Sequence, residues 1–179
     1  PRLEHPTSVA LHRGDLTEAS AQPEADIIVR IAAHSQVQPV VDNPNRAVEN
    51  IAMTQNVLEA AAGMDAFLIN ASSRDVYGSS LTPSEHDVTP NSPNGYAASK
   101  LGSEALVNSY RRTKDISAVS IRLSNVYGPM DDNPRVIPLF IALADAGEEL
   151  TVFGDGTLID FVHIDDVCEA IIASVYRSS

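Results

Sequence analysis

Apolar runs and helical patterns alternate along the 179-residue chain. Short runs rich in branched apolar residues predict strands, and longer stretches with apolar positions three or four apart predict helices. The predicted strands span 8–12, 26–31, 66–71, 117–123 and 150–153, and the predicted helices span 43–62, 95–112, 134–146 and 165–176. Strand and helix alternating at this pace predict an α/β fold with a parallel sheet.

The first long helix has a candidate apolar face, and a glycine follows its last turn. Gly63 is the residue we expect to end the helix, because glycine readily adopts the left-handed conformation of a C-terminal cap. The face that this helix presents to the core is predicted to comprise Val48, Ile51, Ala52, Val57 and Leu58.

Ligands of open parallel sheets bind at the carboxyl ends of the strands. Four groups of residues directly follow predicted strands and are therefore candidate binding positions. They are Asp15, the segment 32–35, the pair Ser72 and Ser73, and the pair 124–125.

Composition excludes several classes of function. The net charge of −12 disfavours nucleic acid as a partner, because binding it relies on basic contacts. No apolar run of 18 or more residues predicts a membrane span. The single cysteine, Cys168, rules out an intramolecular disulfide, and its apolar surroundings predict a buried side chain in a cytoplasmic protein. Acidic composition with only two lysines is typical of proteins from salt-loving organisms.

Tyr96 and Lys100, one of those lysines, are spaced to share a face of the helix 95–112. A phenol has a pKa of ~10, and lowering it to neutrality requires about 4 kcal/mol. A lysine cation ~5 Å away supplies roughly 3 kcal/mol at an effective dielectric constant of ~20. A positively charged cofactor ring could supply much of the rest, so the pair is adequate to generate a phenolate, although this spacing also occurs on many ordinary helices.

The segment NASSRDVYG at 70–78 favours a functional role for the spacing of Tyr96 and Lys100. It predicts a strand that ends in two serines, where a hydroxyl can hydrogen-bond the substrate oxygen that Tyr96 deprotonates. A serine, a tyrosine and a lysine that converge at a strand end are typical of a site for carbonyl and alcohol redox chemistry.

Several ordered blocks together resemble the extended short-chain dehydrogenase/reductases, specifically the NAD-dependent nucleotide-sugar epimerase/dehydratase family. The blocks are GDL at 14–16, IAAHSQV at 31–37, the helix from Asn50 to NVLEAA, SSRDVYG, SPNGYAASKLGSE, RLSNVYGP at 122–129 and VFGDG…DFVHIDDV at 152–167. The resemblance implies a Rossmann-like doubly wound parallel sheet, incomplete as written, over residues 1–179. Residues 129–164 then contribute the start of a substrate-binding region.

The resemblance also implies roles for individual residues. The catalytic set is Ser73, Tyr96 as the base and Lys100 as its electrostatic partner. Ser73 and Asn125 are implied to contact the sugar nucleotide. The implied cofactor is NAD, and no metal is implied. At the adenine, NAD is implied to contact Asp15 and Leu16, and around the loop it is implied to contact Ala32, Ala33 and Asn50. At the nicotinamide end, the implied contacts are Ser72, Tyr96 and Lys100.

The implied reaction is epimerisation of a nucleotide sugar through a transient keto-sugar, as in UDP-glucose 4-epimerase. Dehydratases of the family carry an acidic pair after the catalytic serine or threonine, whereas this chain has Arg74 and Asp75. Arginine is a poor proton donor, which disfavours dehydration. A sugar reductase or dehydrogenase, and a non-catalytic scaffold, remain alternatives. In the family a GDG turn is followed by an Arg-Asp-Phe segment, whereas this chain reads GDGTLIDF, with no arginine and one residue fewer. Arg30 replaces a usual histidine.

No Gly-x-Gly-x-x-Gly or Gly-x-x-Gly-x-x-Gly sequence occurs, although family members open with such a turn to hold the pyrophosphate. We therefore expect the sequence to be a fragment that begins near the family's third strand and lacks the C-terminal end. Weak NAD affinity is expected of the fragment alone. The resemblance further implies a homodimer through the helices 43–62 and 95–112, with a nucleotide-sugar substrate and no nucleic-acid or membrane partner.

Overall fold

The computed structural model describes residues 9–18, 23–80, 83–131, 133, 135–152, 154 and 158–176. Six elements form the first part of the described chain: β1 (Ile27–Arg30), α1 (Val37–Asp42), α2 (Asn45–Met64), β2 (Phe67–Ser73), the short 3₁₀ helix η1 (Arg74–Tyr77) and α3 (Gly95–Thr113). The second part contains β3 (Ala118–Leu123), β4 (Asn125–Tyr127), α4 (Val136–Ala146), β5 (Phe161–His163) and α5 (Ile164–Tyr176).

The main sheet is parallel and has the order β1-β2-β3. Arg30 lies opposite Asn70 across the first pair, and Ser73 lies opposite Leu123 across the second. β4 and β5 form a separate parallel pair, in which Asn125 lies opposite Phe161. The predicted α/β fold with a parallel sheet is confirmed.

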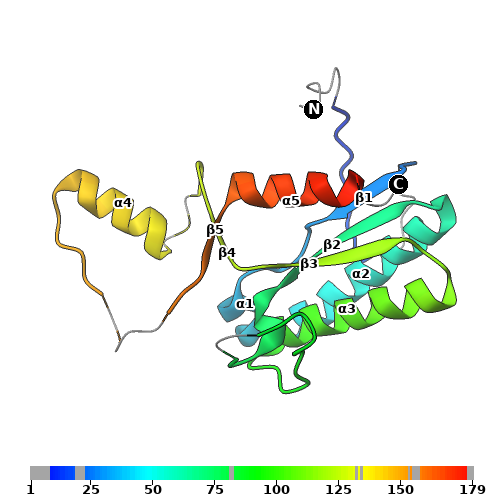
Figure 1. Ribbon diagram of the computed structural model, residues 1–179, viewed down its shortest axis with the longest axis horizontal. Helices are drawn as coiled ribbons and strands as arrows, with labels where there is room; N and C mark the ends of the chain where they lie inside the picture. Colours follow the sequence, from blue (N-terminus) through cyan, green and yellow to red (C-terminus); the bar gives the residue numbers. More distant parts are fainter. Residues whose placement is uncertain are drawn as a thin grey trace.

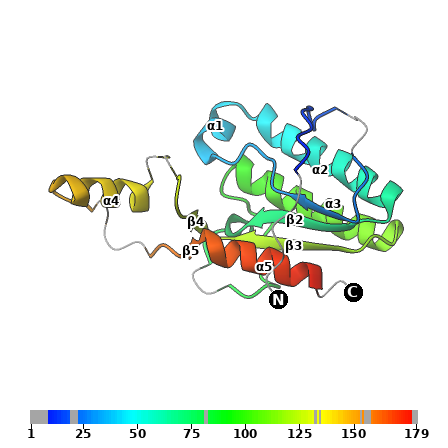
Figure 2. The ribbon, with the colours of Figure 1, turned by 90° about the horizontal axis from the view of Figure 1, so that it is seen from above.

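The elements of the sheet region form three layers (Figures 1 and 2). The helices α2 and α3 lie side by side on one face of the main sheet, and α5 lies on the other face. α4 stands apart from these layers in both views. It buries none of its residues, and Leu139 and Ile141 are exposed. Among the described helices, none is long and apolar enough to cross a membrane.

The core lies between the sheet and the two long helices. Its centre is formed by Val57, Leu58 and Ala61 of α2, which pack against Leu68 of β2 and Val107 of α3. Leu58, Ala61 and Leu68 are completely buried. Burial of such apolar surface is the main favourable contribution to folding.

The predicted face of α2 is partly wrong. Val57 and Leu58 are buried, but Val48 is 66% exposed. Polar Asn50 and Thr54 are buried in its place, because each bonds to a serine of α3: Asn50 Nδ2 to Ser99 Oγ at 3.0 Å, and Thr54 Oγ1 to Ser103 Oγ at 2.8 Å. These paired contacts satisfy polar groups that would otherwise be costly to bury.

The helix cap predicted at Gly63 is also wrong. Gly63 lies inside α2, and the residue that ends the helix is Asp65, whose φ of 55° places it in the left-handed region. Aspartate tolerates this conformation better than most residues because its short side chain forms local hydrogen bonds.

Two predicted strands do not form in the described residues. Residues 9–12 and 150–152 have no strand partner; Ser8 and Phe153 lie outside the described residues. Val9 and Leu11 remain 84% and 79% exposed. An alternating pattern makes a strand only when a neighbour satisfies its backbone groups. The sequence reading missed four short elements, α1, η1, β4 and β5.

Leu58→Ala is expected to lower the free energy of unfolding by about 2–5 kcal/mol, because it leaves a cavity in a fully buried position. Val48→Ala on the same helix is the matched control, and as an exposed substitution it is expected to change stability by no more than about 0.5 kcal/mol. Urea unfolding of both variants measures the difference. Equal effects for the two would contradict this placement of the core.

Candidate active site

The first turns of α3 carry the candidate base. The helix begins after Asn94, whose side chain accepts a hydrogen bond of 2.9 Å from the backbone N–H of Ala97. Such a cap satisfies one of the unpaired N–H groups at a helix start. It fixes the start of the helix two residues before Tyr96, so that Tyr96 and Lys100 face the carboxyl end of β2.

Ser73, Tyr96 and Lys100 converge as the sequence predicts. The Ser73 and Tyr96 side chains line the same pocket, and Ser73 is close enough to lower the pKa of Tyr96. The Lys100 Nζ atom lies 5.7 Å from the centroid of the Tyr96 ring and donates a hydrogen bond of 2.8 Å to the backbone oxygen of Ala71. Ser73 Oγ also accepts from the N–H of Asp75 at 3.2 Å, which fixes the serine at the junction of β2 and η1.

The protein environment raises the pKa of Tyr96 above its ordinary value. Burial is the main cause, the Ser73 hydroxyl opposes it, and the charge of Asp75 raises the pKa further. Lys100 does not offset the effect of burial. These side chains by themselves therefore do not make Tyr96 a base near neutrality, and the phenolate expected beside Lys100 and a cationic cofactor stays a prediction.

Lys100 is 4% exposed, and burial lowers its pKa to about 8, with a smaller contribution from the positive charge of Arg30. Arg30 ends β1 and is 3% exposed. Its Nη1 donates to Asn70 Oδ1 and its Nη2 to the backbone oxygen of Asn50, both at 3.0 Å. Burial lowers the Arg30 pKa to about 10, and its buried Nε has no partner among the described residues.

A pocket of about 810 Å³ opens beside these residues, at the carboxyl ends of the main strands. Five of the sequence-predicted site residues line it: Ser72, Ser73, Tyr96, Lys100 and Asn125. Sequence reasoning missed the polar residues that α1 and the chain before α4 contribute. They are Gln36, Gln38, Asn133 and Arg135. Gln36 lies in the IAAHSQV block without an implied role, and no motif marked the other three.

Asn125 and Cys168 enter the pocket from the second part of the chain. Asn125 Nδ2 donates a hydrogen bond of 2.9 Å to the backbone oxygen of Asp160, to which Ser124 Oγ also donates at 2.8 Å. These bonds hold the end of β3 against the strand β5. Cys168 lies on α5 and is exposed on the pocket wall, so the predicted buried thiol is wrong.

The other five predicted residues do not line this pocket. Asp15 is exposed and accepts hydrogen bonds from the N–H and Oγ1 of Thr17, which lower its pKa. Leu16 packs against the core from the N-terminal segment. Ala32 and Ala33 lie on the chain after β1, Ala32 exposed and Ala33 half-buried. The adenine-side roles implied for these residues stay predictions.

Asn50 supports the chain after β1 from within α2. Its Oδ1 accepts from the His34 N–H at 2.7 Å, and its Nδ2 donates to the His34 oxygen at 3.2 Å. The His34 side chain is paired with Glu49 at 2.6 Å. Asn50 thus links α3, α2 and the loop beside the pocket, while its contribution to cofactor binding stays a prediction.

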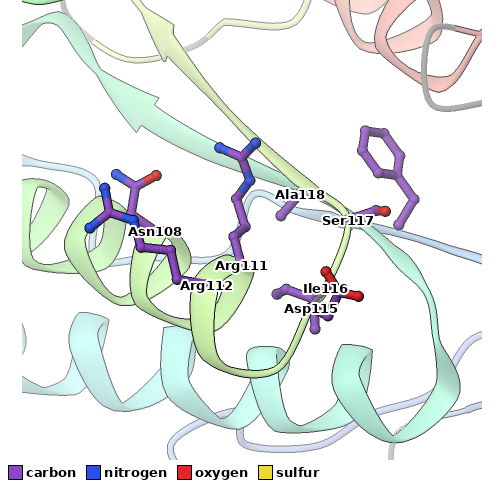
Figure 3. A pocket seen from close by; sticks show the side chains of 8 residues that line it. Asn108, Arg111, Arg112, Asp115, Ile116, Ser117 and Ala118 are labelled. Atoms are coloured by element: carbon purple, nitrogen blue, oxygen red, sulfur yellow. The ribbon is translucent and has the colours of Figure 1, made fainter.

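A second hollow, of about 480 Å³, lies at the opposite end of the main sheet. Figure 3 shows that Arg111 reaches from α3 toward the strands, whereas Arg112 points along the helix beside Asn108. The two guanidinium groups do not converge, as a clamp on one anion would require. The candidate chemistry is therefore confined to the larger pocket.

Comparison with known proteins agrees with this geometry. The model of the "NAD dependent epimerase/dehydratase family" matches residues 2–178. A dTDP-glucose 4,6-dehydratase of Streptomyces antibioticus is 35% identical over 172 residues, which cover 90% of this chain and 50% of the relative. A UDP-glucose 4-epimerase of Mycolicibacterium smegmatis is 34% identical over 166 residues, with coverage of 88% and 53%.

The crystal structure of Thermus thermophilus UDP-glucose 4-epimerase in complex with NAD superposes with a TM-score of 0.80 at 27% identity, and the match covers 95% of this chain and 61% of that one. The chain thus spans about half the length of the curated relatives that it matches. With its parallel sheet, its Ser-Tyr-Lys site and a family match along nearly all its length, the chain belongs to the NAD-dependent epimerase/dehydratase family.

Proposed function

We propose that the protein is an NAD-dependent nucleotide-sugar epimerase, which interconverts sugar epimers through a transient keto-sugar. The observation that carries the proposal is the convergence of Ser73, Tyr96 and Lys100 at one pocket. The similarity to a UDP-glucose 4-epimerase supports this reaction for the whole protein. The expected dimer through α2 and α3 stays a prediction.

The pocket is suited to the nicotinamide end of NAD. Val29, Ile69 and Ile121, one from each main strand, contribute an apolar wall against which a planar ring can pack. Lys100 and the backbone of Ser72 lie at the same strand ends and would hold the ribose and the ring. NAD bound there would supply the hydride acceptor for oxidation of the sugar alcohol.

Within this site, the Tyr96 oxygen would take the proton of the sugar hydroxyl, and Ser73 would donate a hydrogen bond to the same sugar oxygen. Because burial raises the Tyr96 pKa, the ionised phenol needs positive charge beside it. The Lys100 Nζ atom, 5.7 Å from the centroid of the ring, would be one such charge, and the nicotinamide ring of bound NAD would be another.

Dehydration is the second candidate, because a 4,6-dehydratase is 35% identical to the chain. The pocket residues after Ser73 favour epimerisation. Arg74 stands where the dehydratases have an acid, and a guanidinium holds its proton too tightly to protonate a leaving hydroxyl. Asp75 also lines the pocket, next to Tyr96, and is left as a single carboxylate at this position.

The products of the full-length protein with NAD and UDP-, dTDP- or GDP-glucose distinguish these reactions. Epimerisation is expected to give a nucleotide sugar of unchanged mass with a new retention time, whereas dehydration gives a product lighter by one water. Mass spectrometry after chromatography reads both. A dehydrated product would overturn the choice of epimerase, and a product lighter by two hydrogens, formed with one NADH released per molecule, would indicate a dehydrogenase.

Tyr96→Phe is expected to lower turnover by about 10²–10⁴-fold, the usual contribution of a general base. Binding of NAD is expected to persist, since the ring and its packing remain. Tyr110→Phe is the matched control on the same helix, because Tyr110 bonds to Glu59 on α2, outside the pocket. Turnover of Tyr96→Phe within threefold of the wild type would remove the proposed base.

Lys100 gives the folded protein a characteristic pH dependence. Its folded pKa of about 8 lies below the ordinary value of 10.5, so the unfolded chain binds more protons between these values. Stability is therefore expected to rise with pH from about 8 to about 10 relative to Lys100→Met. Urea unfolding across this range measures the difference, with the exposed Lys114→Met as control. A difference in unfolding free energy that does not change with pH would show that the pKa of Lys100 is not lowered in the folded protein.

A further inference from the structure

Glu104 is the third member of a polar row on α3. Tyr96, Lys100 and Glu104 are four residues apart and therefore share one face of the helix. All three face consecutive residues at the end of β2: Tyr96 lies beside Ser73, Lys100 donates to the oxygen of Ala71, and Glu104 Oε1 accepts from Ser72 Oγ at 2.5 Å.

The Glu104 carboxylate joins two strands. Its Oε1 accepts from Arg122 Nε at 2.9 Å and its Oε2 from Arg122 Nη2 at 2.7 Å, which is a bidentate ion pair. Ser72 and Arg122 lie directly opposite each other in the β2–β3 register. A single buried carboxylate, on a residue that is 5% exposed, thus holds both strands at the level of the residue before Ser73.

Arg122 extends the contacts to the chain after β2. Its Nη1 donates to the Tyr77 hydroxyl at 3.1 Å and to the backbone oxygen of Glu85 at 2.7 Å. The guanidinium carbon also lies 4.9 Å from the centroid of the Tyr77 ring. Both ends of the Ser73 segment are therefore attached to the same ion pair, on one side through Ser72 and on the other through η1.

We propose that Glu104, through Ser72 and Arg122, is a positioning residue that sets the Ser73 hydroxyl relative to the Tyr96 oxygen. This inference rests on the proposed function. Neither charge touches the pocket, since Glu104 and Arg122 are not among its lining residues. Their effect on catalysis is exerted through the backbone of residues 72–77, whose displacement would separate Ser73 from Tyr96.

The test replaces both charges together in the full-length protein. Glu104→Gln alone would leave the Arg122 guanidinium half-buried without its counter-ion, which risks misfolding. The double variant Glu104→Gln/Arg122→Gln keeps both side chains polar and the net charge unchanged while removing the bidentate ion pair. Glu59→Gln is the matched control, because Glu59 accepts a hydrogen bond from Tyr110 across α2 and α3, away from Ser73.

The double variant is expected to lower kcat by about 10- to 100-fold, the effect of a small misplacement of reacting groups, with the KM for the sugar nucleotide changed by less than about threefold. Amide hydrogen exchange of residues 72–77 is expected to quicken at least about tenfold, while exchange in α2 and α5 stays at the wild-type rate. Glu59→Gln is expected to change neither measurement.

Turnover of the double variant within twofold of the wild type would overturn the proposal, whatever the exchange shows. Uniformly faster exchange along the whole chain would also overturn it, because the pair would then act on stability alone. If the wild type itself transfers no hydride, the proposed function fails. The exchange of residues 72–77 then still decides whether Glu104 positions Ser73.

Discussion

The attachment of α3 to the carboxyl end of β2 is the interaction on which the candidate site depends. Apolar packing between a helix and a sheet allows neighbouring placements of similar energy, whereas buried polar groups must find partners. Lys100 and Glu104 each have one such partner on β2, at Ala71 and Ser72. These two contacts set the position of α3 along β2, and that position brings Tyr96 close to Ser73.

A second polar layer joins α3 to α2 and completes this arrangement. Asn50 bonds to Ser99 and Thr54 bonds to Ser103, with the same four-residue spacing on both helices. Asn50 also bonds to the backbone of His34, so the loop after β1 is attached to the same layer. The pocket is therefore bordered by segments that are distant in sequence but connected through short polar links.

The charges inside this region differ in sign from the chain as a whole. The net charge is −12, but Arg30 and Lys100 are both buried between β1, α2 and α3. Burial lowers the pKa of each cation, and the same low-dielectric surroundings strengthen its effect on a nearby phenol. Burial is the largest influence on the pKa of Tyr96 and raises it, and the group that opposes it is the Ser73 hydroxyl.

The sequence predicted the long elements well, because several turns or alternations establish a period. It identified β1, α2, β2, α3, β3 and α5, and motif spacing brought Ser73, Tyr96 and Lys100 together. The strands β4 and β5 have three residues each, too few to show a period. Residues 9–12 show the opposite failure, since their pattern suits a strand but no described strand pairs with them. The Glu104–Arg122 pair was missed because an ion pair between elements leaves no local signal beyond the spacing on α3.

The exposure of Cys168 on the wall of the larger pocket has a practical consequence. Because these 179 residues contain no second cysteine, a thiol-directed fluorophore or spin label would attach at one defined position within them without any engineered substitution. The reporter would sit on α5, across the opening from the strand ends. Its signal would follow the filling and emptying of the cavity in real time, independently of any chemical turnover.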